Sequence, residues 1–314
     1  MIPRSRPVIA LLSPGAMGAG IGARLTAAGF RVRTSLTARS DRSVARAYAA
    51  GMIAASDAEL ASCDILLSIV PPADADPLAR RLMPHLATRR AKPLYVDANA
   101  LSPNSKRALG RLLAGVGCDF VDAAILGPPP VEGSDNTRLM LAGARASDAA
   151  MLAVPGVAVR VLDGAVGAAA ALKMCYAGIN KGAAGLAVAM LLAAARNGAA
   201  DALRSEMEIG MPDLFQRAQR QVPDSFGKAY RWIAEMREIA DFLGDDPGAA
   251  TLFKGMAGVF ETLAADVAGD RTNATLLERA IGEEQRGLGE SGAGDVGANS
   301  RNTRPQSLDG ADSA

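Results

Sequence analysis

The sequence contains very few of the residues that hold metal ions or build nucleophilic triads. It has a single histidine, His85, and its cysteines are Cys63, Cys118 and Cys175, which lie far apart. One histidine is too few for a histidine-ligated metal site and leaves a single candidate for a Ser-His-Asp triad, and no CxxC pair is present for zinc. We expect no bound metal, and unpaired cysteines of this kind are typical of a protein in the reducing cytoplasm.

Aromatic residues and net charge are also scarce. Phe, Trp and Tyr make up 4% of the 314 residues, and the formal net charge is +1. Because nucleic-acid-binding surfaces combine basic patches with stacking rings, this composition argues against a nucleic-acid partner. Hydrophobic residues, in contrast, make up 49% of the chain, which is enough for sizeable cores, and the length favours two domains.

The order of apolar runs and helical patterns predicts the domain organisation. Short apolar runs such as 8–12 (VIALL) and 64–70 (DILLSIV) alternate with helical patterns as far as residue 162, which is typical of a doubly wound parallel sheet. Only helical patterns follow. We predict an α/β Rossmann-type domain at residues 1–163, an all-α C-terminal domain at 164–285, and a disordered tail at 286–314, where small and polar residues dominate.

A long helical stretch begins the second domain at residues 164–197. It is rich in Ala and Leu and would span about 50 Å. Lys173 and Lys181 lie within it, and because charges deep in a bilayer are costly, we expect a soluble interdomain helix and no membrane partner. This stretch alone leaves two interpretations open: a functional site around Lys173, or lysines that snorkel from a buried helix.

Two faces of this helix have distinct residue patterns. Tyr176 and Asn180 follow Lys173 at i+3 and i+7, so we expect them to share its face and to orient a substrate. Another face carries glycines, at which a second helix could pack closely, either from the same chain or from a second copy; these are Gly178, Gly182 and Gly185.

A glycine-rich turn follows the first predicted strand. The dinucleotide-binding pattern G-x-G-x-x-G is matched at its second and third positions by Gly15 and Gly18, whereas Ser13 replaces its first glycine. Free N–H groups at the start of the next helix would hold cofactor phosphates, with an ordinary Gly-rich turn as the alternative. The predicted cofactor-binding residues here are Ser13, Pro14, Gly15, Ala16, Met17 and Gly18.

The end of the second predicted strand indicates which cofactor is preferred. NAD enzymes place an acid there for the ribose, but this chain has SLTARSDRS at 35–43, with no acid at the strand end itself. Arg39 and Ser40, with Arg42 beside them, could hold a 2′-phosphate. We therefore predict NADP in preference to NAD, with solvated loop residues as the alternative interpretation.

Together these motifs resemble the β-hydroxyacid dehydrogenases, the family of 3-hydroxyisobutyrate dehydrogenase and 6-phosphogluconate dehydrogenase. The resemblance covers roughly residues 7–285. It rests on PGAMG at 14–18, SIVPP at 68–72, VDANALSP at 96–103, FVDAAILG at 120–127 and GAAAALKMCYAGINKG at 167–182.

The resemblance implies roles for particular residues. Val70, Pro71 and Pro72 would flank the cofactor, and Asn99 would contact both the nicotinamide end and the substrate. Gly127 would hold the substrate carboxylate, and Lys173 would be the catalytic group. The family also implies a homodimer, with contacts between the helical domains.

The substrate half of the family pattern is altered. Where the family has a serine in D-A-P-V-S-G-G, this chain has Leu126 before Gly127 and Pro128. The family's K-x-x-x-N asparagine falls on Ala177, for which Asn180 could substitute, and its later Lys-Asp pair falls near Glu235. The chain thus resembles a divergent branch with a variant helical domain.

The implied function is hydride transfer between a nicotinamide cofactor and a small hydroxyacid or related alcohol, with Lys173 as general acid/base. Burial among alanines is expected to lower the pKa of Lys173 and the cofactor phosphates to raise it. The alternatives are an imine reductase on the same scaffold, a non-catalytic NADP-binding sensor, and a structural or interaction protein.

Overall fold

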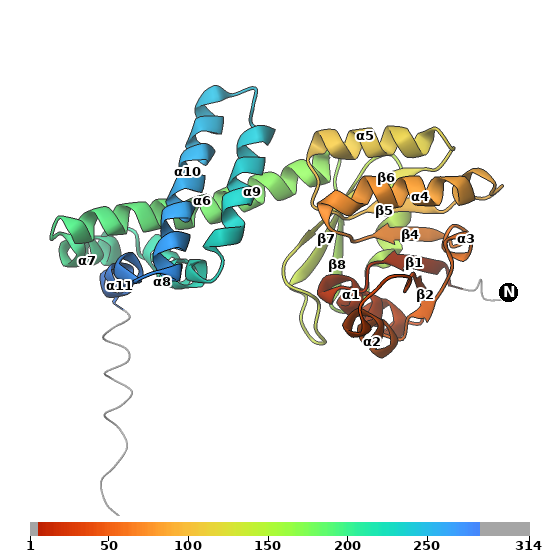
Figure 1. Ribbon diagram of the computed structural model, residues 1–314, viewed down its shortest axis with the longest axis horizontal. Coiled ribbons are helices and arrows are strands. Elements are labelled where there is room, and N and C mark those ends of the chain that lie inside the picture. The colour runs from red at the N-terminus through yellow and green to blue at the C-terminus, as the bar shows by residue number, and fades with distance from the viewer. Residues whose placement is uncertain (1–5, 283–314) are drawn as a thin grey trace, which may run out of the picture. The chain divides into compact units, whose positions relative to one another are not determined.

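A sheet with the strand order β3-β2-β1-β4-β5-β6-β7-β8 dominates the first half of the chain (Figure 1). The computed structural model describes residues 6–282, and the tail predicted at 286–314 lies outside them. The strands are β1 (Val8–Leu12), β2 (Arg31–Thr34), β3 (Ile53–Ala54), β4 (Ile65–Ser68), β5 (Leu94–Asp97), β6 (Phe120–Leu126), β7 (Thr137–Ala142) and β8 (Val157–Val161).

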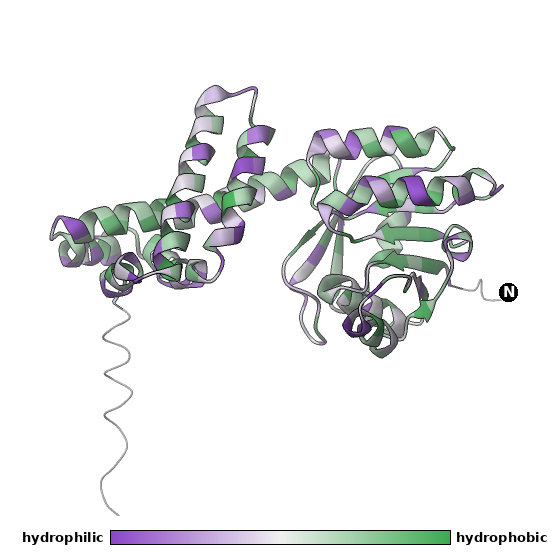
Figure 2. Cartoon of the chain, in the orientation of Figure 1, coloured by the Kyte–Doolittle hydropathy of each residue, from purple (hydrophilic) through white to green (hydrophobic). Residues whose placement is uncertain are grey.

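Alternating side chains give this sheet a hydrophobic core on each face. In β1, Ile9 and Leu11 join one core, whereas Ala10 and Leu12 join the other. Figure 1 shows α1 (Ala16–Ala27) and α2 (Asp41–Ala49) along one face, and α4 (Ala75–Ala87) and α5 (Pro103–Ala114) along the other. Figure 2 shows the strands as mainly hydrophobic, whereas α4 and α5 carry both hydrophobic and hydrophilic residues. The predicted Rossmann-type domain is confirmed.

Three short helical segments complete this domain: α3 (Asp57–Leu60) and the 3₁₀ helices η1 (Pro72–Asp74) and η2 (Ala146–Leu152). The S-x-x-E spacing of Ser56 and Glu59 predicts a capping box at the start of α3. It is present, since the backbone N–H of Ser56 donates to the Glu59 carboxylate at 2.8 Å and the Ser56 hydroxyl accepts from the Glu59 N–H.

The sheet departs from the predicted parallel arrangement at one place. Strands β6 and β7 pair antiparallel, while all other neighbouring strands are parallel. A parallel pair needs a crossover of about a dozen residues or more, usually with a helix. The segment between Leu126 and Thr137 is too short and contains no helix, so the chain turns back directly.

Beyond β8, the part of the chain that the structure describes contains only helices and turns, as predicted. The helices are α6 (Ala168–Arg196), α7 (Ala200–Gly210), α8 (Pro212–Phe226), α9 (Ala229–Phe242), α10 (Pro247–Ala268) and α11 (Thr272–Ala280).

The chain separates into two compact units. The first extends to Leu186 and takes in Ala229–Glu261, while the second contains Ala187–Lys228 and continues from Thr262. Helices α6 and α10 therefore contribute to both units. The predicted boundary at 163/164 marks the change from sheet to helices, and as a domain boundary it stays a prediction.

A buried ion cluster, made of Asp97, Lys106 and Asp122, fixes the start of α6. Asp122 on β6 accepts hydrogen bonds from the backbone N–H groups of Gly167, Ala169 and Ala170 at 2.9, 3.0 and 3.2 Å. The Lys106 ammonium from α5 lies 2.5 Å from an Asp97 oxygen and 3.4 Å from an Asp122 oxygen. None of the three side chains is exposed, so α6 begins at a fixed point above the sheet.

The glycine face of α6 packs against α10 of the same chain. A Cβ on Gly178 would lie 3.1 Å from the Phe253 ring, and one on Gly185 would lie 2.7 Å from the Met256 sulfur. By length and hydropathy alone α6 could cross a membrane. Packing of the glycine face on α10 accounts for part of this apolar composition, and 39% of the apolar window is buried.

Candidate functional site

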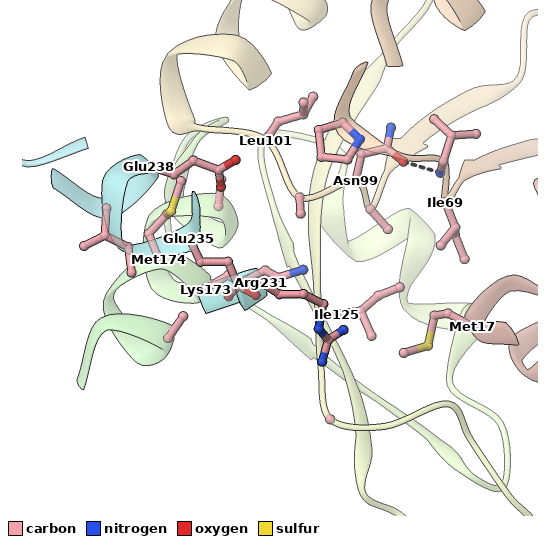
Figure 3. Close-up of a pocket in the computed structure, with 18 of the residues that line it drawn as sticks. Met17, Ile69, Asn99, Leu101, Ile125, Lys173, Met174, Arg231, Glu235 and Glu238 are labelled. Atoms are coloured by element: carbon pink, nitrogen blue, oxygen red, sulfur yellow. Dashed lines mark hydrogen bonds between the residues drawn. The ribbon is translucent and has the colours of Figure 1, made fainter. Parts of the chain in front are cut away.

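A cavity of about 640 Å³ lies within the first unit, where loops at the carboxyl ends of β4, β5 and β6 face α6 and α9 (Figure 3). In open α/β sheets, ligands bind beyond the carboxyl ends of the strands. The cavity is lined by Met17, Ile69, Val70, Pro72, Ala98, Asn99, Ala100, Leu101, Ile125, Gly127, Ala170, Lys173, Met174, Ala177, Lys181, Arg231, Glu235, Glu238 and Ile239.

The glycine turn joins β1 to α1 with backbone geometry suited to glycine at its first position. Ser13 has a φ of +78°, in the left-handed region that favours glycine. A Cβ on Gly18 would lie only 2.0 Å from the Ser13 carbonyl oxygen, so the third glycine of the pattern is needed for close packing, as predicted. Of the six predicted turn residues, Met17 lines the cavity.

The start of α1 fits a cofactor phosphate. A Cβ on Gly15 would have only one heavy atom near it, the Ser13 hydroxyl oxygen at 3.9 Å, so the space beside the turn is open. The first turn of α1 holds no acidic residue, and its first N–H groups lack partners within the helix. An open space beside unpaired donors at a helix N-terminus is the usual setting for a bound phosphate.

Asn99 lines the cavity and also joins two loops. Its side-chain oxygen accepts a hydrogen bond from the Val70 N–H at 2.6 Å, drawn as a dashed line in Figure 3. Its side-chain NH₂ donates to Ser68 at 3.0 Å and to Asp97 at 2.6 Å. Both donors are therefore used within the chain, so Asn99 positions the loop at Val70 and is left with acceptor capacity alone for a ligand.

Gly127 lines the cavity at the end of β6. Its φ is +103°, and a Cβ there would lie 2.0 Å from the Asn136 carbonyl oxygen. The backbone alone therefore requires glycine at this position, whatever its role toward a substrate.

Lys173 reaches the cavity from the second turn of α6. Among residues 6–282 its ammonium has no hydrogen-bond or ion-pair partner. Burial lowers the pKa of Lys173, the nearby Lys106 ammonium lowers it further, and Glu238 acts in the opposite direction. Burial thus acts on the pKa of Lys173 in the direction expected from the sequence, and a lowered pKa suits a group that exchanges a proton near neutral pH.

Two predicted substrate-binding residues, Tyr176 and Asn180, do not line this cavity. The α6 residues that do are Ala170, Lys173, Met174, Ala177 and Lys181, all on one side of the helix. With about 3.6 residues per turn, the lining residues form one arc of the helix surface with Lys173 at its edge. Tyr176 and Asn180 lie beyond Lys173, outside this arc. The side chain of Tyr176 is directed outward, since the residue is 51% exposed.

Four charged residues line the cavity to which the sequence patterns assigned no role. Arg231, Glu235 and Glu238 share one face of α9 at i, i+4 and i+7, and Lys181 forms an ion pair with Glu235. Burial and the neighbouring cations lower the pKa of Lys181 to about 8, while the ion pair favours its charged form. Arg231, Glu235 and Glu238 form what we call the charged wall of the cavity. In the sequence, charged residues at helical spacing next to the apolar Trp232 and Met236, both buried in the structure, are the pattern that indicates it.

The remaining predicted cofactor residues lie outside the cavity lining. Pro71 precedes η1, and Arg39 and Ser40 follow β2. Ser40 is the N-cap residue of α2, and its hydroxyl contacts that of Ser43 at 3.2 Å. Among the described residues, no group of three His, Cys, Asp or Glu side chains is placed to hold a metal ion.

Two family models match the chain. Residues 8–154 match the NAD binding domain of 6-phosphogluconate dehydrogenase, and residues 194–263 match a domain of unknown function, DUF1932. The second match contains α9, which supplies the charged wall of the cavity. No protein with a curated function matches the sequence.

Solved structures of the same fold include proteins of known and unknown activity. The conserved protein MTH1747, of unknown function and structurally similar to 3-hydroxyacid dehydrogenases, is 30% identical with a TM-score of 0.70, over 83% of this chain and 97% of its own. The 3-hydroxyisobutyrate dehydrogenase of Mycobacterium tuberculosis is 20% identical (TM-score 0.64; 83% and 95%). An imine reductase from Myxococcus stipitatus, in complex with NADP⁺, is 17% identical (TM-score 0.52; 88% and 100%).

Changing Gly15 or Gly18 of the turn to alanine is expected to have different effects on stability and on NADPH binding. Gly18→Ala should lower the free energy of unfolding by about 1–3 kcal/mol, because the new Cβ meets a backbone oxygen. Gly15→Ala should change it by less than about 0.5 kcal/mol and yet weaken NADPH binding, because its methyl group fills the phosphate space. Urea unfolding and fluorescence titration with NADPH measure the two effects. An unchanged NADPH affinity in Gly15→Ala would show that the phosphates bind elsewhere.

Proposed function

Because the chain belongs to the 6-phosphogluconate dehydrogenase-like family, with an NAD-binding domain followed by a DUF1932 domain, we propose that it is an NAD(P)-dependent oxidoreductase. The reaction is the interconversion of a small hydroxyacid, or a related alcohol, with its carbonyl form. The observation that carries this proposal is the position of Lys173, which lines the same cavity as Met17 of the glycine turn and Asn99.

The residues of the cavity have separate roles in this reaction. A nicotinamide bound beside Met17, Val70 and Pro72 would accept or supply the hydride. Lys173 binds the reacting oxygen, takes the hydroxyl proton during oxidation and returns a proton to the carbonyl oxygen during reduction. Asn99 keeps the loop at Val70 in place, and the apolar side chains of Ile69, Leu101 and Ile125 restrict water around the reacting carbon.

The fold is shared with enzymes that reduce C=N bonds as well as with those that act on hydroxyacids. A lysine ammonium in the cavity favours the second group. It can hold a negatively polarised oxygen by charge and hydrogen bonding, whereas a protonated imine would be repelled by it.

Lys173→Met is expected to reduce turnover by about 10²–10⁴-fold, because the proton-exchanging group is lost, while NADPH binding stays near normal. Steady-state assays with a panel of short hydroxyacids and NADP⁺ measure the effect. The matched control is Lys254→Met, an exposed lysine on α10. In the native enzyme, oxidation requires neutral Lys173 and should speed up as pH rises through its lowered pKa, whereas reduction requires the ammonium and should slow over the same range.

Near-full turnover by Lys173→Met would remove Lys173 from the chemistry. Reduction of a cyclic imine by the native protein, without activity on any hydroxyacid of the panel, would replace this function by imine reduction.

NADP is the proposed cofactor in preference to NAD. Arg39 follows β2, where the adenine ribose lies in this type of domain, and the side chains at the end of β2 are the uncharged Thr34 and Ser35. Arg39→Ala should raise the Kd for NADPH by about tenfold or more, through loss of a charged hydrogen bond, and leave that for NADH nearly unchanged. Arg90→Ala, in the exposed α4–β5 connection, is the control. Equal losses for both cofactors would contradict a 2′-phosphate site at Arg39.

A homodimer is proposed as the assembly, with contacts along α6. Tyr176, Ile179, Leu186 and Met190 are each more than half exposed and form an apolar stripe on the side away from the cavity. The small residue Ala183 lies at its midpoint, so two antiparallel copies crossing there would place Tyr176 of one against Met190 of the other. The stripe is thus self-complementary, as a two-fold interface requires.

Ile179→Asp combined with Leu186→Asp is expected to convert this dimer to monomers, because two charges would be buried in the contact. Size-exclusion chromatography with light scattering reports the mass. The control is Leu252→Asp, which changes an exposed leucine of α10 outside the stripe. A dimer that persists in the double variant would place the interface elsewhere.

A further inference from the structure

The loop after β6 lacks the groups that usually hold a carboxylate. Anion sites built from backbone need several successive N–H donors. Gly127 is followed by three prolines, Pro128, Pro129 and Pro130, which have no N–H, and preceded by the apolar Leu126. This part of the cavity lining can therefore offer the N–H of Gly127 and no second donor from the next three residues.

The cavity contains another group suited to a carboxylate, Arg231 of α9. Its guanidinium makes no hydrogen bond or ion pair within residues 6–282 and lies 6.0 Å from the centre of the Tyr230 ring. Figure 3 shows Lys173 and Arg231 directed toward the middle of the cavity. A guanidinium is always charged at neutral pH and its planar fork matches the two oxygens of a carboxylate.

The nearest acidic residue on the same helix face is already occupied. Glu235 lies four residues after Arg231, a spacing at which the two side chains could pair. Lys181 from α6 holds the Glu235 carboxylate instead and lies over the Trp232 ring, 5.8 Å from its centre. Glu238 is almost two helical turns from Arg231 along α9. The Lys181–Glu235 pair thus leaves the positive charge of Arg231 available to a ligand.

We infer that Arg231 binds the carboxylate of the substrate while Lys173 holds the reacting oxygen, an assignment that rests on the proposed function. Arg231 is then the residue that selects hydroxyacids over neutral alcohols. Arg231, which lies in the helical domain, binds the carboxylate for which the proline-rich loop after β6 lacks N–H donors. Lys181 is a positioning residue, which acts by keeping Glu235 away from Arg231.

The experiment compares an acid with its methyl ester. The acid is whichever member of a panel of short 2- and 3-hydroxyacids binds the NADPH complex most tightly by calorimetry; with reduced cofactor present, no oxidation occurs. Arg231→Met should weaken binding of the acid by about 10- to 100-fold and leave the ester nearly unchanged. Arg231→Lys should restore part of the difference. The control is Arg237→Met on the same helix, since Arg237 pairs with Glu261 and does not line the cavity.

A second pair of variants tests the positioning role of Lys181. Lys181→Met frees Glu235 to pair with Arg231, so it should weaken acid binding by a similar factor. Adding Glu235→Gln to Lys181→Met removes the competing charge and should restore the affinity. The methyl ester distinguishes this role from a structural one, because a purely structural loss at Lys181 would weaken binding of the acid and of the ester alike, whereas the competing Glu235 carboxylate weakens binding of the acid alone.

Binding and turnover separate the two proposals. If the native complex shows no preference for any acid over its ester, or if Arg231→Met weakens acid and ester equally, the assignment of Arg231 is overturned even when the enzyme turns over hydroxyacids. If the acid preference depends on Arg231 but no hydroxyacid is oxidised with NADP⁺, the anion site stands and the proposed oxidoreductase function fails.

Discussion

The position of the cavity depends on one buried ammonium group held by two carboxylates. Lys106 lies between Asp97 and Asp122, and all three side chains are fully buried. From Asp97 the contacts continue through Asn99 to the Val70 loop, and from Asp122 they continue to the first turn of α6. Taking one member out of such a network leaves an uncompensated charge at a cost of about 3–5 kcal/mol. The same three residues therefore set the positions of both the Val70 loop and the helix that carries Lys173.

Patterns that are local in sequence predicted most of the fold. The βα alternation, the glycine turn, the Ser56–Glu59 capping box and the change to an all-helical region all follow from neighbouring residues, and the structure has each of them. The antiparallel pairing of β6 with β7 did not follow, because the pattern of a buried strand is the same in either direction. Strand direction depends on the connection, and here it is too short for a crossover helix.

The candidate site was predictable only in part, because local patterns do not report contacts between distant segments. The periodicity of α6 groups residues by face, but it does not say which face turns toward the sheet. That rotation is set by the Asp122 cap and by the close packing of the glycine face on Phe253 and Met256, so the cavity receives Ala177 and Lys181 instead of Tyr176 and Asn180. The charged wall of α9 is separated from Lys173 by more than fifty residues of sequence, and no local motif connects Arg231 to it.

Ser13 gives the glycine turn a property that the usual motif lacks. A serine held at a φ of +78° costs about 1 kcal/mol that glycine would not. In return, the turn carries a hydroxyl whose oxygen faces the open space at Gly15. The usual dinucleotide turn, with glycine at this position, offers a phosphate backbone groups alone. In the proposed cofactor complex this hydroxyl would add a side-chain contact to the phosphate, so that single substitutions at residue 13 would tune the strength of cofactor binding.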